Sequence, residues 1–322
     1  MIGKLTPDEL RECVLSVIKK RRKEVVKGSA SGCDSAALRT DELLLLTTDP
    51  ITGGADDCGK LAVHVCCNDI AAAGGEPMAI LVTVLAPENA GLSDIKRVMT
   101  DVERESEKLN VEVIGGHSEF TDAVNRTVVS ATVVGIKSRN FRFVPFEKGQ
   151  SVMVTKTLGL EGTSVIAESF AERVRLSDEE LAEAKSAGDS LSVVADGRAS
   201  VESGAEIAAM HDITEGGVLG ALCEVLDGSG FGAEIDIDSA PVLAVTKKIC
   251  AQLSLNPYRL LSSGSMLIVT SEPEKVEKAL SGKGIASSVI GKITDGKGVF
   301  VNGRSEAVSV KPDEIYKLFK EI

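Results

Sequence analysis

Residues Gly59–Pro77 read GKLAVHVCCNDIAAAGGEP, and this stretch does most to define the fold. Its apolar and small residues predict a helix over Gly59–Ala73, closed by the glycines that follow. The apolar run Met78–Ala86 then predicts a buried strand. With only 3% aromatic residues and no tryptophan, the cores must be built from Val, Ile, Leu and Ala, a mixture that suits sheets covered by helices.

Helices and strands alternate on both sides of this stretch. A polar helix is expected to begin after Thr6, which caps it with Glu9 as the capping-box carboxylate, and to run to about Lys23. An amphipathic helix is expected over Leu92–Leu109. The other elements expected in the first half are strands at 43–46, ending in Thr47-Thr48-Asp49, and at 111–114 and 127–136.

The segment Lys137–Gly149 is expected to connect two domains, with the boundary near Arg139 and domains of residues 1–138 and 139–322. The second half is expected to hold strands at 152–155, 233–237, 266–270 and 287–293, and helices at 163–173, 178–187, 217–227, 242–253 and 273–280. Asn68-Asp69-Ile70 and His211-Asp212-Ile213 look alike, each before a run of small residues ending in Gly-Gly. That similarity is too short to establish a duplication.

The charge and cysteine content exclude several classes of protein. Acidic residues outnumber basic ones by 48 to 36 in 322 residues, a net charge of −12, so nucleic acid is not an expected partner. No stretch approaches the ~18 apolar residues of a membrane span and the N-terminus is polar, so a cytoplasmic protein with no membrane partner is expected. The seven cysteines show no CxxC or zinc spacing and are expected to be reduced and mostly buried.

Four aspartates stand beside small or polar neighbours at strand ends and loop starts: Asp34, Asp49, Asp69 and Asp212. The P-loop, the GxGxxG turn, HExxH and GxSxG are all missing, so the common nucleotide, zinc-protease and hydrolase signatures give no support. Mg²⁺ is usually held by a few carboxylates together with substrate phosphates, so converging aspartates suit a metal–ATP site. Taken singly, each aspartate is more commonly a helix cap or turn residue, and only their joint pattern favours the site.

That joint pattern consists of motifs in a fixed order. They are Gly32-Cys33-Asp34-Ser35-Ala36, Thr48-Asp49-Pro50-Ile51-Thr52-Gly53, Asn68-Asp69 with the closing Gly-Gly-Glu-Pro, Gly115-Gly116-His117-Ser118-Glu119, and His211-Asp212-Ile213-Thr214-Glu215-Gly216-Gly217. Over roughly residues 28–303 they resemble the AIR-synthase-related (PurM-like) superfamily in order and spacing. The resemblance implies an α+β, two-domain PurM-like fold. In that fold the four-stranded sheet of the N-terminal domain pairs with its twin across a homodimer, and the C-terminal domain has a sheet backed by helices.

The resemblance also implies ATP and Mg²⁺ as cofactors. The implied metal ligands are Asp34, Asp49, Asp69 and, from the second domain, Asp212. The residues implied in nucleotide binding are Gly32, Thr48, Asn68, Gly115, Gly116, His117, Glu119, Thr214, Gly216 and Gly217. His117 and Asp212 are candidates for a catalytic role, although packing explains His117 as readily.

Details of the motifs resemble the HypE-like branch of the superfamily most closely, among them the turn Leu158–Thr163. That branch works on a cysteine at the extreme C-terminus, whereas this chain ends Phe319-Lys320-Glu321-Ile322 and its last cysteine is Cys250. The leading hypothesis is a homodimeric enzyme that activates an oxygen of a small substrate by phosphoryl transfer from Mg²⁺-ATP. Two alternatives stay open: a kinase of the thiamine-monophosphate type, and a nucleotide-binding maturation factor that works with a partner protein and has no turnover of its own.

Overall fold

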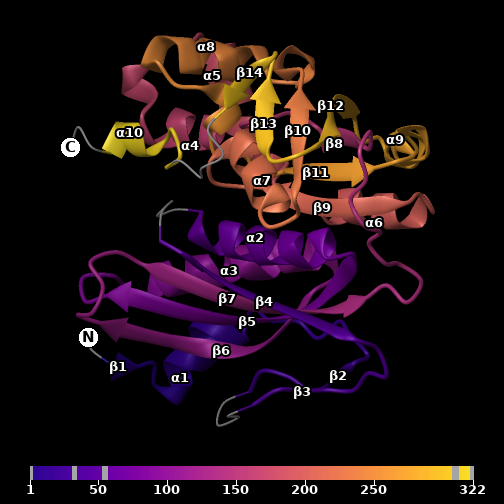
Figure 1. Cartoon of the computed structure of the whole chain (residues 1–322). Helices are drawn as coiled ribbons and strands as arrows, with labels where there is room; N and C mark the ends of the chain where they lie inside the picture. The colour runs from indigo at the N-terminus through magenta and orange to yellow at the C-terminus, as the bar shows by residue number, and fades with distance from the viewer. Residues whose placement is uncertain (1–2, 31–34, 53–56, 307–311, 320–322) are drawn as a thin grey trace. The chain divides into compact units, whose positions relative to one another are not determined.

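The computed structural model describes residues 3–30, 35–52, 57–306 and 312–319. The chain divides into two units, Met1–Arg139 and Asn140–Ile322, each with a sheet and helices of its own (Figure 1). No helix in the described ranges is both long and apolar enough to cross a membrane. All six cysteines in those ranges are buried thiols.

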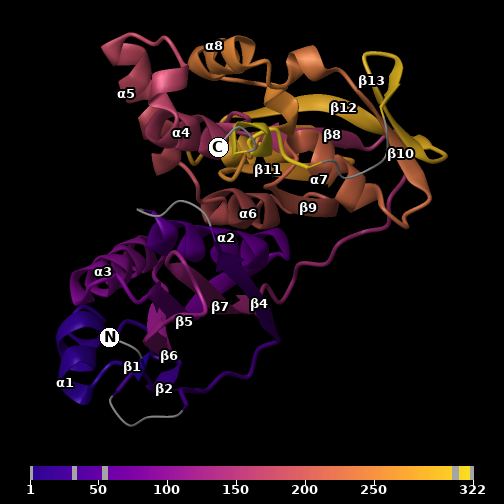
Figure 2. The same cartoon turned by 90° about the vertical axis from the view of Figure 1, so that its left-hand side faces the viewer.

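The first unit consists of a sheet covered on one face by two helices. Its strands are β1 (Gly3–Lys4), β2 (Val25–Lys27), β3 (Ala37–Leu38), β4 (Leu44–Ile51), β5 (Gly75–Pro87), β6 (Glu112–Thr121) and β7 (Val128–Lys137), and its helices are α1 (Pro7–Leu10), the π-helix η1 (Arg11–Leu15), α2 (Cys58–Ala72) and α3 (Leu92–Leu109). The main sheet has the order β1-β6-β5-β7-β4, in which β5 and β6 are parallel and the other neighbours antiparallel. α2 and α3 pack against each other over one face of this sheet (Figure 2).

The sequence pattern of the two covering helices explains where they lie. α3 has the predicted bounds, and the apolar stripe that contains Ile95, Val98 and Val102 is buried. α2 is buried on almost every side and packs against α3 and against β4, β5 and β7; Ala62 and Cys66 are 0% exposed. The predicted four-stranded sheet is present as four long strands, with the two-residue β1 added at the edge of β6.

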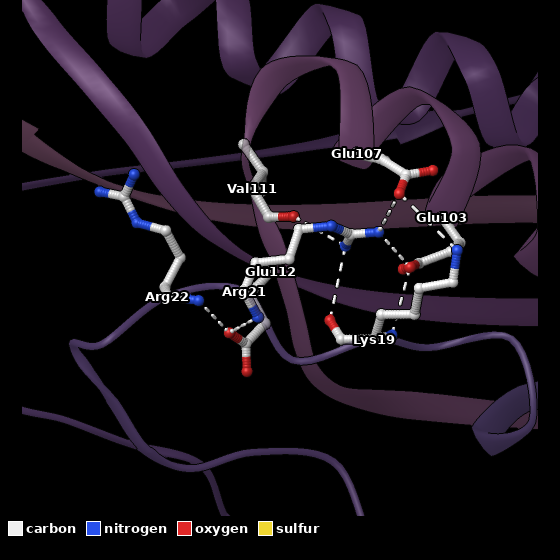
Figure 3. Close-up of polar contacts among 7 residues, drawn as sticks. All are labelled: Lys19, Arg21, Arg22, Glu103, Glu107, Val111 and Glu112. Atoms are coloured by element: carbon white, nitrogen blue, oxygen red, sulfur yellow. Dashed lines mark hydrogen bonds and ion pairs between the residues drawn. The ribbon is translucent and has the colours of Figure 1, made fainter.

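The N-terminal helix is shorter than predicted. The capping box of Thr6 and Glu9 forms, but helical structure ends at Leu15 instead of Lys23. Beyond it the backbone N–H groups of Arg21 and Arg22 donate to the Glu112 carboxylate on β6 (Figure 3). A chain whose amides are held by a distant carboxylate cannot also form helical bonds, so the prediction was wrong at this end.

The second unit is built on a seven-stranded sheet in the order β14-β13-β10-β12-β8-β11-β9. Its strands are β8 (Ser151–Thr155), β9 (Ile207–Ile213), β10 (Phe231–Ile235), β11 (Ser265–Thr270), β12 (Ser287–Asp295), β13 (Gly298–Val301) and β14 (Arg304–Glu306). Its α-helices are α4 (Leu160–Ser169), α5 (Asp178–Ser186), α6 (Val194–Glu202), α7 (Gly217–Leu226), α8 (Ala244–Leu253), α9 (Pro273–Ser281) and α10 (Tyr316–Phe319), and short 3₁₀ turns lie at Ala171–Arg173, Ala187–Asp189, Ile237–Ser239 and Pro257–Arg259. Within the described residues of this sheet, β10 and β13 are parallel and the other neighbouring strands are antiparallel.

Two apolar clusters hold this unit together. One contains residues of β8, β11 and α7, such as Val154, Leu267 and Leu222. The other joins α4 and α8 to the C-terminal segment, with Ile166 and Ile249 among its members. The structure therefore confirms a sheet backed by helices.

Three features of the structure differ from the sequence predictions or were left open by them. α6 and β9 were not predicted, and β6 continues from the predicted Val111–Ile114 through the Gly-Gly-His motif to Thr121. Asn68-Asp69-Ile70 lies in helix α2, whereas His211-Asp212-Ile213 lies in strand β9. Since the two motifs occupy different kinds of element, their likeness is no sign of a duplicated unit.

Candidate functional site

The side chains of Asp49 and Asp69 meet on the helix-covered side of the first unit's sheet. Asp49 comes from β4 and Asp69 from α2, and the hydroxyl of Thr47 donates to Asp69 Oδ2 at 2.6 Å. Thr47 and Asp49 are two residues apart on a strand, so they share a face. Burial, the charge of Asp69 and a hydrogen bond with its carboxyl raise the pKa of Asp49 to about 6. Two carboxyl groups held this close can give oxygen ligands to a divalent cation.

Asn68 and Thr48, which were predicted to bind the nucleotide next to this pair, lie in different places. Asn68 is fully buried in α2 next to Asp69. Thr48 lies on the opposite face of β4, where its hydroxyl donates to the carbonyl of Ala131 at 2.9 Å and accepts from Thr132 at 3.0 Å. Thr48 therefore belongs to the face of the sheet that α2 does not cover.

A cavity of about 350 Å³ lies beside β6 in the same unit. Leu10 and Val14 of the N-terminal helical segment form an apolar wall of the cavity. Gly115–Ser118 of β6 line another side of it. Ser29 and Ser35 also line it, on either side of residues 31–34. The predicted ligands Gly32 and Asp34 lie between these two residues in the sequence and outside the described ranges.

In the Gly115–Glu119 motif, close packing between strands requires a glycine at position 116. A Cβ at Gly116, where φ is +150°, would lie 1.9 Å from the carbonyl oxygen of Val82 on β5, so only glycine allows the two strands to approach. His117 Nε2 lies 3.1 Å from Glu119 Oε2, and both side chains are about one-third exposed. The motif thus presents an imidazole and a carboxylate, with His117 lining the cavity.

Within one chain the structure does not bring this motif to the aspartate pair. Strands β5 and β7 lie between β6 and β4, and three strand spacings amount to roughly 14 Å. In the part of the chain that is described, no three His, Cys, Asp or Glu residues are grouped closely enough to hold a metal ion. Asp49 and Asp69 therefore form a pair that needs further oxygen donors to complete a metal site.

The remaining predicted residues belong to the second unit. Asp212, on β9, is 3% exposed, and its neighbour His211 contacts Glu224 at 2.9 Å. Thr214, Gly216 and Gly217 follow in the turn that leads into α7, where the glycines have φ of +77° and +59°. A Cβ at Gly217 would lie 2.6 Å from the Tyr258 carbonyl oxygen, so the turn requires glycine there.

The backbone N–H of Gly216 is already engaged. It donates to Asp313 Oδ2 at 2.7 Å, a residue that the sequence did not single out.

Glu161 is a second residue that was missed. It lies in the first turn of α4 and is 7% exposed. Burial raises its pKa to about 7, with Asp313 and Glu215 adding to the rise and a hydrogen bond with Ser263 opposing it. Glu161 lies in the turn Leu158–Thr163, whose sequence resembles the HypE-like branch, but that resemblance gave the carboxylate no role.

A buried ionic network holds residues 19–22, which come after the N-terminal helical segment that lines the cavity (Figure 3). Glu112 Oε2 accepts the backbone N–H groups of Arg21 at 2.7 Å and Arg22 at 2.6 Å. Glu103 accepts the N–H of Lys19 at 3.2 Å and pairs with the guanidinium of Arg21. Glu103 and Glu112 are 5% and 3% exposed, so these charge-assisted bonds are shielded from water.

Replacing Glu112 with glutamine is expected to lower the free energy of unfolding by about 1–2 kcal/mol, because a neutral amide accepts the two N–H groups more weakly than a carboxylate. Urea denaturation measures this change. The matched control is Glu107→Gln, since Glu107 is 56% exposed and lies 3.9 Å from Arg21; its effect should stay within about 0.5 kcal/mol. Equal effects from both variants would show that the bonds of Glu112 do not hold the segment.

Family models match both halves of the chain. The model described as AIR synthase related protein, N-terminal domain, matches residues 23–137, and that of the C-terminal domain matches residues 147–304. The chain belongs to the AIR synthase related protein family. The superfamily that the motifs suggested from the sequence is therefore confirmed.

Relatives within the AIR synthase related family include carbamoyl dehydratase HypE of Rhizobium leguminosarum, 25% identical over 273 residues, which cover 80% of this chain and 75% of that protein. Selenide, water dikinase of Pseudomonas aeruginosa is 30% identical over 225 residues, covering 67% of this chain and 62% of that protein. The crystal structure of hydrogenase maturation protein HypE in complex with ATP matches with a TM-score of 0.78 at 18% identity, covering 97% of this chain and 96% of that one. The predicted two-domain PurM-like fold is confirmed, and by their names both sequence relatives are enzymes.

Proposed function

We propose that this protein is a homodimeric enzyme that binds Mg²⁺-ATP and activates an oxygen of a small substrate by phosphoryl transfer. The carboxylate pair of Asp49 and Asp69 carries the proposal. Burial and the nearby charge of Asp69 raise the pKa of Asp49, a cost that a bound cation would reduce. Further support comes from the HypE structure that contains ATP and has the same fold.

The donor set fits magnesium. Carboxylate oxygens are the ligands that Mg²⁺ prefers, and Asp34 and the nucleotide's phosphates would complete the set begun by Asp49 and Asp69. Thr47 orients Asp69 by donating to Oδ2, as outer hydrogen bonds do in metal sites. Bound Mg²⁺ would neutralise charge on the phosphates, the main requirement of phosphoryl transfer. Asp212 is proposed as the ligand from the second unit.

The homodimer is proposed from the uncovered face of the sheet. Leu46 lies on this face of β4 beside Thr48 and is 68% exposed, and a second copy laid on the face would bury it. The aspartate pair lies on the other, helix-covered face of β4, so the proposed dimer leaves the pair on the side of the sheet away from the partner.

Thermal unfolding with Mg²⁺-ATP, with ATP and a chelator, and with neither tests the proposal, with ADP, AMP and phosphate followed in the same samples. Mg²⁺-ATP at ~100 times its Kd should stabilise the protein by about 2.7 kcal/mol, and ADP should accumulate. A phosphorylated product that persists would point to a small-molecule kinase of the thiamine-monophosphate type. Stabilisation without turnover would favour a maturation factor that needs a protein partner, and no metal-dependent shift would rule out the proposed site.

A further inference from the structure

The C-terminal segment 312–319 holds the turn that leads into α7. Asp313 is 2% exposed; its Oδ2 accepts the N–H of Gly216 at 2.7 Å, and its Oδ1 accepts the N–H of Ile315 at 2.9 Å. The hydroxyl of Tyr316 donates to Glu215, the residue before Gly216. The segment thus contacts two successive residues of the turn, about a hundred positions away in sequence.

The rest of the segment is firmly attached to the second unit. Ile315 and Leu318 are buried in the apolar cluster with α4 and α8. Glu314 Oε2 accepts the N–H of Asn256 at 3.0 Å, and Arg173 donates to the carbonyl of Leu318 at 3.2 Å. Asp313 is therefore presented to the turn by a segment with its own anchors. This segment lies beyond residue 304, where the match to the C-terminal family model ends.

Besides the close approach of Gly217 to the Tyr258 carbonyl, backbone hydrogen bonds hold the turn. Its glycines have positive φ, a conformation that costs glycine little and also restricts it little. The carbonyl of Thr214 accepts from Gly217 at 3.2 Å and from Ser262 at 3.3 Å. The bond from Gly216 to Asp313 is shorter and charge-assisted, so it is the strongest of these contacts.

The Asp313 carboxylate is kept in acidic surroundings. Burial and the charge of Glu215 raise its pKa against the backbone hydrogen bonds of Ile315, Gly216 and Leu261, and Glu161 also lies close enough to interact with it. A buried carboxylate that faces two other acids is unfavourable unless its hydrogen bonds compensate. The bond to Gly216 is one of those that do.

We propose that Asp313 is a positioning residue for the nucleotide site. It fixes the α7 turn, and through the turn it sets the placement of Thr214, which follows β9. This inference rests on the proposed function and on the nucleotide contact that the sequence motif implies for Thr214. Asp313 acts through Gly216 and does not itself touch the ligand.

The experiment compares Asp313→Ala with Glu314→Ala in the full chain. Both remove a carboxylate from the same segment, but only the first removes a contact with the turn. By calorimetric titration, Asp313→Ala should weaken Mg²⁺-ATP binding by about 10-fold or more, the range seen when outer supports of a site are lost. Glu314→Ala should leave the affinity within about 2-fold of wild type, and Asp313→Asn, which keeps an acceptor oxygen, should recover part of the loss.

Amide hydrogen exchange over residues 213–218 supplies a readout that does not depend on the nucleotide. Exchange at Gly216 should accelerate in Asp313→Ala and not in Glu314→Ala. Unchanged or tighter nucleotide binding by Asp313→Ala, with wild-type protein that binds Mg²⁺-ATP, overturns this inference alone. Wild-type protein that binds no Mg²⁺-ATP overturns the proposed function, even where the exchange result shows that Asp313 holds the turn.

Discussion

Replacing Asp69 with asparagine is expected to lower Mg²⁺-dependent ATP turnover by about 100-fold or more, with little loss of stability. The amide can still accept the hydrogen bond from Thr47, but it lacks the charge that attracts a divalent cation. Losing that charge also removes a cause of the raised pKa of Asp49. The metal-free variant should therefore unfold at the wild-type temperature or slightly above it. Turnover at several Mg²⁺ concentrations and unfolding in chelator measure the two effects.

Two further variants make this result specific. Asp94→Asn changes an acid at the start of α3 that accepts the N–H of Gly91 at 2.8 Å, and its turnover should match that of wild type. Thr47→Val removes the support of Asp69 and should reduce turnover by about 10-fold. Wild-type turnover in Asp69→Asn would mean that Asp69 holds no metal needed for catalysis.

Local periodicity was sufficient to predict the elements that bury one apolar stripe of a helix or one continuous apolar stretch of sequence. α3 has its predicted bounds because Ile95, Val98 and Val102 form an apolar stripe that only a helix can bury on one side. α2 and β5 follow from one apolar stretch divided by Gly74 and Gly75. In each case the information lies within a few residues of the element.

Elements determined by distant contacts could not be predicted in this way. The N-terminal helix stops at Leu15 because Glu112, some ninety positions away, accepts the N–H groups of Arg21 and Arg22. β6 continues across Gly115 and Gly116 because the close approach of Val82 on β5 excludes a side chain at Gly116. The predicted strand ended at residue 114, before both glycines, yet both lie within β6.

The residues of the candidate site also divide into those that local sequence motifs identify and those whose importance depends on distant contacts. The sequence motifs selected Asp49 and Asp69, and the structure places these two carboxyl groups together. The motifs gave neither Glu161 nor Asp313 a role, because their importance comes from burial and from the charges of nearby acids. A single acidic letter in a turn or near a C-terminus carries no local mark of either property.

Replacing Glu161 with glutamine is expected to stabilise the protein at pH 8 by about 3 kcal/mol and to change its stability little at pH 5. The pKa of Glu161 is raised to about 7 in the folded protein, from 4.5 for an ordinary glutamate. Between pH 4.5 and about pH 7 the folded state keeps a proton on Glu161 that the unfolded chain has lost. Wild-type stability therefore falls as the pH rises through this window. Glutamine resembles the protonated acid at every pH, and this contribution to the fall disappears.

Urea denaturation at pH 5, 6, 7 and 8 measures the difference between the two proteins, which should grow steadily across the series. Glu168→Gln is the matched control, because Glu168 is exposed on the same helix α4 and its effect should stay within about 0.5 kcal/mol throughout. A variant that is equally destabilised at pH 5 and pH 8 would contradict the prediction. It would mean that the hydrogen bond with Ser263 outweighs burial, and that the folded protein keeps Glu161 ionised beside Asp313. The acidic surroundings of the α7 turn would then carry one more charge at pH 5 than we infer here.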